Sequence, residues 1–478
     1  MNGTVQVINE EPMARTLQSA RKPAGADRSD SIAAPRYSEI AIAEALAASY
    51  SSAWRYCTER SEWMVWNGCA WEKDTACAVR TEIRLAVKRE ANKLAREKSS
   101  GESPEIIHRQ ARRLATNQTI TGVERILQSH ESLTISIKAF DADIWALNTP
   151  DGTIDLRSGS IRTHRPLDFH CKQTSVSAGG DCPRWYQFLA ETFGNGPDML
   201  GYVQRVAGYM LTGETREHAF WFAYGGGGNG KSVFFDTLRW VLGDYASVAA
   251  ADTFMADKHA QHPTDLARLA GARLVLANET EEGTRWAESK LKQVTGGDQI
   301  TARFMRQDSF EFKPQFKLVF IGNHLPSLRN VDTAMRRRIH ILPFLRQPSS
   351  PDQHLPEKLK GEAAGILKWA LAGCLDWQRN GLQPPAAVVA ATHDYLDQED
   401  AVARWLSECV DVSPRHHEVV GTQELFDSWA AWAKACEEST RSLRWLSSAL
   451  SSKGFSKGQN PDNRRTGFSG LKLRIPPP

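Results

Sequence analysis

The sequence predicts an α/β core, flanked by a mostly helical N-terminal region and by a C-terminal region of helices and one basic hairpin. Three observations lead to this prediction. Short apolar, strand-like runs alternate with helical stretches between residues 218 and 344. A glycine-rich loop, YGGGGNGKS, separates the first of these runs from a helical one. On both sides of the core the apolar residues return to helical spacing.

Length and composition limit the class of protein. At 478 residues the chain is long enough for about three domains of ordinary size. The hydrophobic fraction of 41% and the charged fraction of 24% are typical of a soluble globular protein. No apolar run approaches the ~20 residues of a membrane span, and no signal region is recognised, so we expect a cytoplasmic protein. Eight cysteines without a CxxC pair predict reduced thiols, with neither a zinc site nor disulfides.

Local patterns divide the chain into six predicted parts, which differ in periodicity and composition. In order they are a disordered arm (1–36), a mostly helical N-terminal domain (37–140), a β element with a helical region (141–215), a P-loop core (216–350), a helical extension (351–400) and a winged-helix-like DNA-binding domain (401–478). A Lys/Arg-rich run from Arg80 to Lys98 is interpreted as a solvated helix face.

The glycine-rich loop predicts phosphate binding. Gly225 to Ser232 satisfies G-x-x-x-x-G-K-[ST] between an apolar run and a helix, as this motif requires. Lys231 would reach the β- and γ-phosphates, and the Ser232 hydroxyl would ligate Mg²⁺. A flexible linker would not explain Lys-Ser at the start of a helix. The predicted ATP contacts are Gly225, Gly228, Asn229, Gly230, Lys231, Ser232 and Val233.

A carboxylate follows the next apolar run, ARLVLAN. Glu279 comes directly after it, where a carboxylate can hold Mg²⁺ and polarise an attacking water, which is the Walker B task. Taken alone, the segment is equally well an acidic surface turn. We favour Glu279 because it ends the strand, and Glu281 and Glu282 remain candidates for the same role.

Two further signals follow the acidic turn. Asn323 ends the run FKLVFIGN, where its amide could orient a lytic water, although an asparagine in this position is often only a turn residue. The stretch DTAMRRRIHILPF then carries three consecutive arginines, 336 to 338. They are either surface charge or the source of an arginine finger, which in trans would require an oligomer.

In this order and spacing, these segments resemble a known family. GGGGNGKS, RLVLANETEEG, LKQVTGGDQITARFMRQDSFEFKPQFKLVFIGNHLP and DTAMRRRIHILPF are similar to the superfamily 3 helicase domain of phage and plasmid primases and of the poxvirus primase-helicase. The resemblance covers about Asp141 to Phe344 well and the C-terminal region more loosely. It implies an AAA+-like P-loop core that uses ATP and Mg²⁺ and assembles as a hexameric ring.

The resemblance also implies roles for single residues. Lys231 and Ser232 match the Walker A pair, Glu279 the Walker B carboxylate and Asn323 the motif C sensor. Arg337 and Arg338 match an arginine pair, one of which would act on a neighbouring subunit's ATP. The chain departs from the family pattern at Val233, where threonine is frequent, and at Arg336, where an aromatic residue is frequent. Neither departure removes a catalytic group.

The family also has a hairpin that points into the ring channel. Here ITARFM and FEFKP would form its strands, with RQDS (Arg306 to Ser309) at the tip. Arg303, Arg306 and Lys313 would contact phosphates of single-stranded DNA, unless this is a plain surface hairpin. Basic residues near the C-terminus would suit a wing that contacts DNA phosphates, or they merely make the end of the chain soluble. These residues are Lys453, Lys457, Arg464, Arg465, Lys472 and Arg474.

The predicted function is an ATP-dependent DNA helicase that replicates a phage, satellite or plasmid element in the bacterial host cytosol. Residues before the resemblance are mostly helical without paired acidic metal ligands, so we expect no primase domain. The expected partners are single-stranded and forked DNA, identical subunits, and a separate primase or polymerase. Two alternatives remain, an ATP-switched initiator or loader without strand displacement, and a small-molecule kinase that shares the P-loop.

Overall fold

The structure, a computed structural model, describes most of the chain. The described residues are 35–97, 103–256, 263–278, 284–303, 309–328, 331–348, 350–413, 419–436, 438, 440, 442–459 and 466–474. Contacts divide the chain into two compact units, residues 1–51 with 75–134 and residues 52–74 with 135–478. These units follow packing alone, so the six functional parts remain a prediction.

The first compact unit is helical in its described part. It contains α1 (Glu39–Tyr50), α2 (Ala78–Arg96), α3 (Pro104–Leu114) and α4 (Asn117–Gln128). The side chain of Ser38 caps the start of α1, and that of Thr116 caps the start of α4. On α2, Val79, Ile83 and Val87 recur every four residues and are buried. The lysines and arginines of α2 lie mainly on the other, exposed side, which agrees with the predicted solvated face.

Two small antiparallel sheets belong to the second unit. The first pairs β1 (Trp54–Cys57), β2 (Glu62–Trp66) and β3 (Trp71–Lys73). The Asn67-Gly68 pair, whose residue types favour a hairpin turn, brings Trp66 opposite Trp71. The second pairs β5 (Ala146–Thr149), β6 (Gly152–Asp155) and β7 (Ile161–Arg162). It confirms the β element predicted after residue 141. The two-residue strand β4 (Thr134–Ile135) is the fourth strand of the first sheet, whose order is β3-β2-β1-β4.

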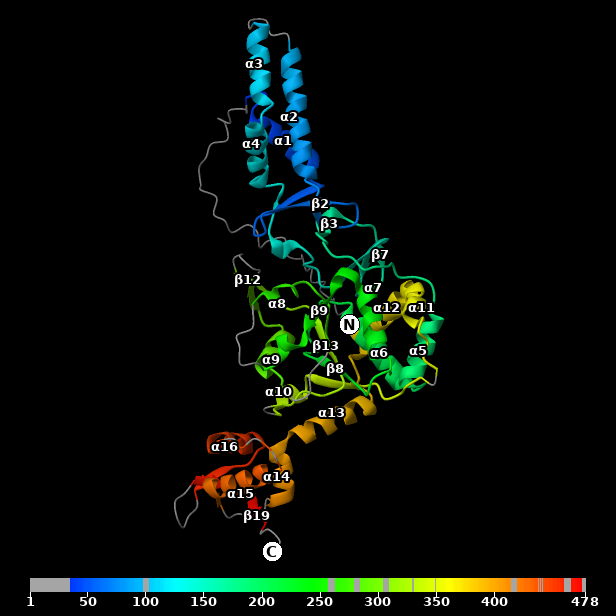
Figure 1. The fold of residues 1–478 in the computed structure, drawn as a ribbon, viewed down its shortest axis with the longest axis vertical. Coiled ribbons are helices and arrows are strands. Elements are labelled where there is room, and N and C mark those ends of the chain that lie inside the picture. The colour runs from blue at the N-terminus through cyan, green and yellow to red at the C-terminus, as the bar shows by residue number, and fades with distance from the viewer. Residues whose placement is uncertain are drawn as a thin grey trace, which may run out of the picture. The chain divides into compact units, whose positions relative to one another are not determined.

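A five-stranded parallel sheet forms the centre of the second unit (Figure 1). Its strand order is β14-β8-β13-β10-β9. The strands are β8 (Phe220–Tyr224), β9 (Ala246–Ala250), β10 (Leu274–Asn278), β13 (Lys317–Gly322) and β14 (Ile339–Pro343). Four of them lie in the predicted apolar runs, whereas β9 was not predicted. The structure thus confirms a mixed α/β core.

Both faces of the sheet are covered by helices, because residues along a strand alternate between them. On β8, Trp221 and Ala223 join one apolar cluster, and Phe220 and Phe222 join the other. The first cluster includes residues of α5 (Pro183–Phe193), α6 (Pro197–Met210), α7 (Lys231–Leu242), α11 (Leu355–Gly361) and α12 (Ala363–Asn380). The second includes residues of α8 (Pro263–Ala267), α9 (Glu288–Gly296), α10 (Thr333–Arg336) and α13 (Ala386–Glu399).

Helices α6 and α12 cross with their backbones in direct contact. A Cβ added to Gly208 of α6 would lie 2.0 Å from the backbone nitrogen of Cys374, and one added to Gly373 of α12 would lie 2.0 Å from the backbone oxygen of Gln204. No side chain larger than hydrogen fits at either glycine. The crossing therefore depends on both glycines.

Two buried cations lie at the edge of the sheet where the parallel strands begin. Arg273 precedes β10, and its guanidinium donates to the carbonyls of Leu211 and Ala146, each at 2.6 Å. Lys317 begins β13, and its Nζ donates to the carbonyls of Thr212 and Gln315. Both side chains are 1% exposed, and burial lowers the pKa of each. We call this pair the amino-edge cations.

The predicted hairpin between β10 and β13 is present. Its strands, β11 (Ile300–Arg303) and β12 (Ser309–Phe312), pair antiparallel with Arg303 opposite Ser309. Ser309 was predicted at the tip and instead belongs to β12. The remaining tip residues, 304–308, lie outside the described residues, and Arg306 is among them.

The C-terminal part has three helices, α14 (Ala401–Cys409), α15 (Thr422–Ala435) and α16 (Leu443–Ser452), around a tryptophan-rich core. The predicted helices and hairpin are confirmed. Strands β17 (Lys457–Gln459) and β18 (Thr466–Phe468) pair antiparallel, and β16 (Val420–Gly421) pairs with β18. A separate pair joins β15 (Val410–Val412) to β19 (Leu471–Leu473). Throughout the described ranges, no helix combines the length and apolar character of a membrane span.

Candidate functional site

The glycine-rich loop joins β8 to α7 at the edge of the sheet where the parallel strands end. Gly230, the residue before α7, has a φ of +85°, which favours glycine. A Cβ there would also lie 3.0 Å from the Phe188 ring and 3.1 Å from the Thr192 hydroxyl. The side chain of Asn229 donates to the carbonyl of Phe344 at 2.5 Å and ties the loop to the end of β14. The loop is thus fixed where a 12-residue helix presents its unpaired N–H groups.

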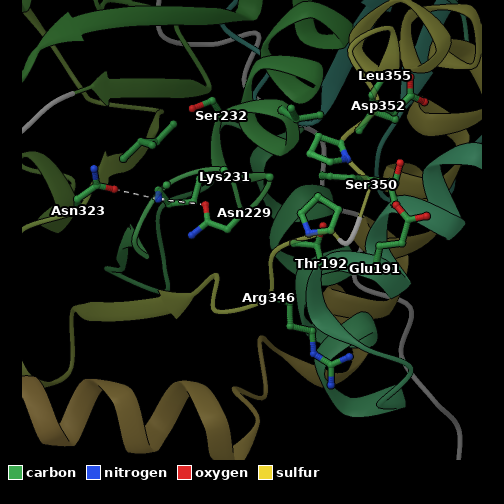
Figure 2. A pocket seen from close by; sticks show the side chains of 18 of the residues that line it. Glu191, Thr192, Asn229, Lys231, Ser232, Asn323, Arg346, Ser350, Asp352 and Leu355 are labelled. Carbon is green, nitrogen blue, oxygen red and sulfur yellow. Dashed lines mark hydrogen bonds between the residues drawn. The ribbon is translucent and has the colours of Figure 1, made fainter.

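Lys231 lies at the centre of the site. Its Nζ donates to the carbonyl of Gly225 at 2.5 Å, to Oδ1 of Asn229 at 3.1 Å and to Oδ1 of Asn323 at 3.1 Å. Figure 2 shows the two asparagines on opposite sides of the ammonium. The side chain is 5% exposed, and burial lowers its pKa. All three acceptors are neutral, so an anion nearby would favour the charged form.

A cavity of about 670 Å³ opens beside this loop. Ser232 and Val233 line it from α7, and Asn323 and His324 line it after β13. Helix α5 and the segment after β14 form the remaining wall (Figure 2), with Arg184, Phe188, Glu191, Thr192, Arg346, Pro348, Ser350, Pro351, Asp352 and Leu355. Sequence reasoning missed this wall. Its only local signal is that Phe188 and Thr192, four residues apart, share one face of the predicted helix.

The wall formed by α5 and the segment after β14 combines apolar and charged groups. Phe188 and Leu355 line it with carbon atoms. Asp352 accepts a hydrogen bond from Lys358 at 2.8 Å, which lowers the pKa of the Asp352 carboxyl, and Arg184 lies 3.8 Å away. The cavity therefore offers N–H groups and an ammonium for an anion, together with apolar and charged side chains from α5 and the segment after β14.

The two predicted catalytic strand ends lie on neighbouring strands. Asn278, the last residue of β10, is in register with Ile321 of β13, two residues before Asn323. Asn323 is brought to Lys231 as described. Glu279, with Glu281 and Glu282, lies outside the described residues. Its assignment as the Walker B carboxylate remains a prediction.

The three consecutive arginines have different surroundings. Arg338 is buried, and its guanidinium donates to the hydroxyl of Thr295 at 3.2 Å and to the carbonyl of Ala334 at 3.0 Å. Burial, with the neighbouring charge of Arg337, lowers the pKa of Arg338. Arg336 pairs with Asp397 and Asp400.

Arg337 differs from both of its neighbours. Its side chain is exposed, and within the described ranges it makes no side-chain hydrogen bond or ion pair. It is therefore the member of the predicted arginine pair that is accessible to another molecule.

The predicted DNA contacts are only partly described. Arg303 and Lys313 are exposed on the hairpin strand β11 and just after β12. Arg464 and Arg465 lie outside the described residues. Lys453 instead donates to the buried carboxylate of Asp400 at 2.5 Å, so its charge is already paired.

Comparison with known protein families gives two matches. Residues 43–194 match the family described as D5 N terminal like, and residues 223–338 match a family of unknown function (DUF5906). The first match begins well upstream of Asp141, where the predicted resemblance was taken to begin. The predicted limit at Asp141 was therefore wrong. The family match includes most of the residues predicted to form the N-terminal domain.

Curated relatives come from large DNA viruses. The chain is 24% identical over 336 residues to "Putative helicase L207/L206" of Acanthamoeba polyphaga mimivirus, covering 63% of this chain and 34% of that protein. It is 25% identical over 306 residues to "Putative helicase 022R" of Frog virus 3, covering 59% and 31%. It is 30% identical over 200 residues to "Putative helicase 121R" of Invertebrate iridescent virus 3, covering 40% and 21%. The chain thus spans between about a fifth and about a third of the length of these relatives.

Among solved structures, the chain is similar to one titled "The A form apo structure of NrS-1 C terminal region-CTR". The TM-score is 0.47 at 10% identity, over 91% of this chain and 100% of that one. A second structure of the same region reaches 0.49 at 9% identity, over 90% and 100%. Such values are too low to define the fold.

The family matches and the viral relatives point to the D5-like superfamily 3 primase-helicases. They confirm the resemblance that the motifs predicted. Two parts of the chain are thus similar to described families, and stretches of it are similar to viral proteins named as helicases.

Proposed function

We propose that this chain is the motor of an ATP-dependent superfamily 3 DNA helicase, with an AAA+-like core that works as a hexameric ring in the replication of a viral or plasmid-like genome. One observation carries the proposal. The ammonium of Lys231 lies between the loop carbonyl of Gly225 and the strand-end amide of Asn323. The phosphate-binding lysine and the predicted sensor therefore meet at one point, as hydrolysis of a bound triphosphate requires.

ATP would occupy the cavity beside the loop. The loop N–H groups and Lys231 would hold its phosphates, and the apolar wall with Phe188 and Leu355 would hold its base. Asn323 would orient the attacking water. The carboxylate that polarises this water is proposed to be Glu279, for the reasons given by the sequence.

Mg²⁺ suits the donors of this site. The Ser232 hydroxyl lines the cavity beside Lys231, and oxygen donors are what this cation prefers. The described residues contain no cluster of three or more His, Cys, Asp or Glu side chains that would form a dedicated metal cage. Mg²⁺ is instead usually held by one or two protein oxygens together with substrate phosphates. Ser232 and Glu279 would provide the protein oxygens, and the metal would neutralise charge on the phosphates.

Arg337 is the arginine that we propose to act on a neighbouring subunit's ATP. It is exposed, whereas Arg338 is held by Thr295 and Ala334 inside its own chain. A finger must be free to reach across a subunit boundary. Arg338 would keep the segment in place.

Single-stranded DNA is the proposed track. The exposed Arg303 and Lys313 flank the hairpin and would contact phosphates without reading sequence. The printed names of the viral relatives, helicases in each case, support this choice. The C-terminal helices and hairpin are proposed to be a winged-helix-like module that binds duplex DNA or a partner such as a separate primase or polymerase.

Strand displacement on a forked DNA tests this function. The purified protein is expected to separate the strands with ATP and Mg²⁺, whereas the Lys231→Ala variant should not. An initiator or loader, the alternative, would bind DNA and hydrolyse ATP without separating the strands. A small-molecule kinase would show no stimulation of hydrolysis by DNA, and that result would refute the proposal.

The arginine assignment has its own test. Arg337→Ala should bind ATP normally but hydrolyse it at least 100-fold more slowly, and a mixture with Lys231→Ala subunits should recover part of the activity. Recovery is expected because each mutant supplies the group that the other lacks at some subunit boundaries. Normal hydrolysis by Arg337→Ala would exclude it as the finger.

A further inference from the structure

A second cavity, of about 860 Å³, lies between the small sheet β1–β3 and the hairpin β11–β12. Trp71 of β3 and Arg60, before β2, line one wall. Phe310 and Phe312 of β12 line another. Both walls belong to the same compact unit, and no lining residue is shared with the cavity beside the glycine-rich loop. Its size falls in the range of ligand-binding cavities.

The cations of this cavity are largely unengaged. Arg60, Lys138 and Lys313 line it, and among residues with described placement their side chains make no hydrogen bond or ion pair. Lys172 also lines it, and its Nζ donates to the backbone carbonyl of Asp244 at 3.3 Å. None of these four cations forms an ion pair with a carboxylate among the described residues, although the charge of Lys172 helps to lower the pKa of Asp141.

The carboxylates of the cavity are mostly satisfied by protein donors. Three of the four accept hydrogen bonds, Asp141 from Cys171, Asp244 from Gln173 and Glu72 from Asn67. Glu311, exposed on β12, is the exception. Lys73 and Glu62 pair with each other at 2.5 Å. These hydrogen bonds leave the carboxylates charged, so the five lining cations exceed the four lining carboxylates by one, and Arg60, Lys138 and Lys313 have no ion-pair partner among the described residues.

Aromatic rings lie among these cations. Phe310 and Phe312 lie on the same face of β12, with ring centroids 6.0 Å apart, and Phe140 lines the cavity from before β5. Rings interleaved with free basic groups are the features that bind single-stranded nucleic acid, because every base can stack and every nucleotide has a phosphate.

We propose that this cavity holds a short stretch of single-stranded DNA, with phosphates against Arg60, Lys138 and Lys313 and bases against Phe310 and Phe312. The inference rests on the proposed function, in which DNA follows the hairpin. It adds that the small sheet β1–β3, within the D5 N terminal like match, grips the strand together with the motor hairpin.

A double variant, Arg60→Ala with Lys138→Ala, tests the cationic wall. Binding of a labelled oligothymidylate is followed by fluorescence anisotropy over a range of salt concentrations. We expect affinity about 10-fold lower in 0.1 M salt and a salt slope smaller by about 1.4, since each lost phosphate contact removes about 0.7 on a single strand. Hydrolysis of ATP without DNA should be unchanged, because neither residue lines the cavity beside the loop.

The matched control is Lys360→Ala, which removes an exposed lysine of α11 that lines neither cavity. It should leave both affinity and slope as in the wild type. Phe310→Ala should weaken binding about 5-fold without changing the slope, since it removes stacking and no charge.

The outcomes separate the two proposals. If the wild type binds no oligothymidylate, the proposed helicase function is wrong and this inference falls with it. If the wild type binds and the double variant matches it, the inference alone is wrong. An equal loss in Lys360→Ala would assign the effect to general surface charge and would also overturn the inference.

Discussion

Buried cations lie at both edges of the central parallel sheet, but their surroundings differ. At the edge where the strands begin, Arg273 and Lys317 donate to backbone carbonyls in packed surroundings. At the edge where they end, Lys231 is nearly as buried, but its ammonium faces a cavity of about 670 Å³. Burial lowers the pKa of all three cations.

The difference lies in what surrounds each charge. The carbonyls that surround the amino-edge cations belong to segments of the fold, so these charges hold the β5–β7 element and the end of α6 against the sheet. The acceptors of Lys231 include the exposed side chain of Asn323, which can rotate away when an anion arrives. A buried cation beside open space is suited to a ligand, whereas one surrounded by backbone is suited to the fold.

The largest effect is expected from replacing the lysine beside the cavity. Lys231→Met should reduce ATP hydrolysis at least 100-fold, because the phosphates lose their cation. The thermal midpoint should stay equal or rise, since burial disfavours the charged form and the change removes that cost. Steady-state hydrolysis and a melting curve check both expectations, and retained turnover would contradict the assignment of the loop.

Replacing a cation at the edge where the strands begin should instead lower the stability of the fold. Arg273→Met should lower the free energy of unfolding by about 2–4 kcal/mol, because the carbonyls of Leu211 and Ala146 lose their donors inside the protein. Chemical denaturation measures this loss. Arg239→Met is the matched control, since Arg239 is exposed and pairs only with Asp236 on the same helix, so a change below about 0.5 kcal/mol is expected. Equal losses in both variants would remove the distinction between the two edges.

A smaller, pH-dependent effect is expected from His340 of β14, which lies between the edges. The Tyr202 hydroxyl donates to its Nδ1 at 3.0 Å, and burial lowers the pKa of His340 from 6.5 to about 4. The folded protein therefore resists a proton that the unfolded chain accepts below pH 6.5, so stability is present above that pH and is lost as the pH falls toward 4.

Between pH 7.5 and pH 5 the loss should amount to about 2 kcal/mol. His340→Gln should flatten this part of the pH profile of the denaturation midpoint. An unchanged profile would mean that other groups cause the acid sensitivity.

The smallest effect is expected at Lys453, a half-buried cation of the C-terminal part. Because its ammonium is paired with the buried carboxylate of Asp400, which keeps Arg336 as a second partner, Lys453→Ala should lower stability by about 1–2 kcal/mol and leave DNA affinity within 2-fold of the wild type. Anisotropy with duplex and single-stranded oligonucleotides checks this. A large loss of affinity would restore Lys453 as a DNA contact, as the sequence predicted.

Much of the central sheet could be predicted because its strands are marked by local apolar runs. Strand β9 could not, since Ala246–Ala250 reads ASVAA and its small residues favour no structure strongly. The small sheet β1–β3 was visible only as a tryptophan-rich patch with a turn signal. Contacts between residues far apart in the sequence decide whether this small sheet packs with the helices before it or with the central sheet after it.

The candidate site also has residues that could be predicted from the sequence and residues that could not. Lys231 and Asn323 could be named because a loop motif and a strand end are local features. The wall from α5 and Arg346 could not, since those residues reach the cavity only through packing across the chain. Arg337 and Arg338 are adjacent and identical in type, and only the end of α10 turns one outward and buries the other. The Walker B carboxylate and the tip of the hairpin stay predictions.

The glycine crossing of α6 and α12 bears on how the protein can be divided. Helix α6 lies between the two family matches, and α12 lies beyond both. A fragment that stops at residue 344 would keep every predicted catalytic group but would strip the backbone face of α6 at Gly208 and remove the buried Trp369 and Trp377 from the core. The shortest length of chain that folds is therefore longer than the length that carries the chemistry.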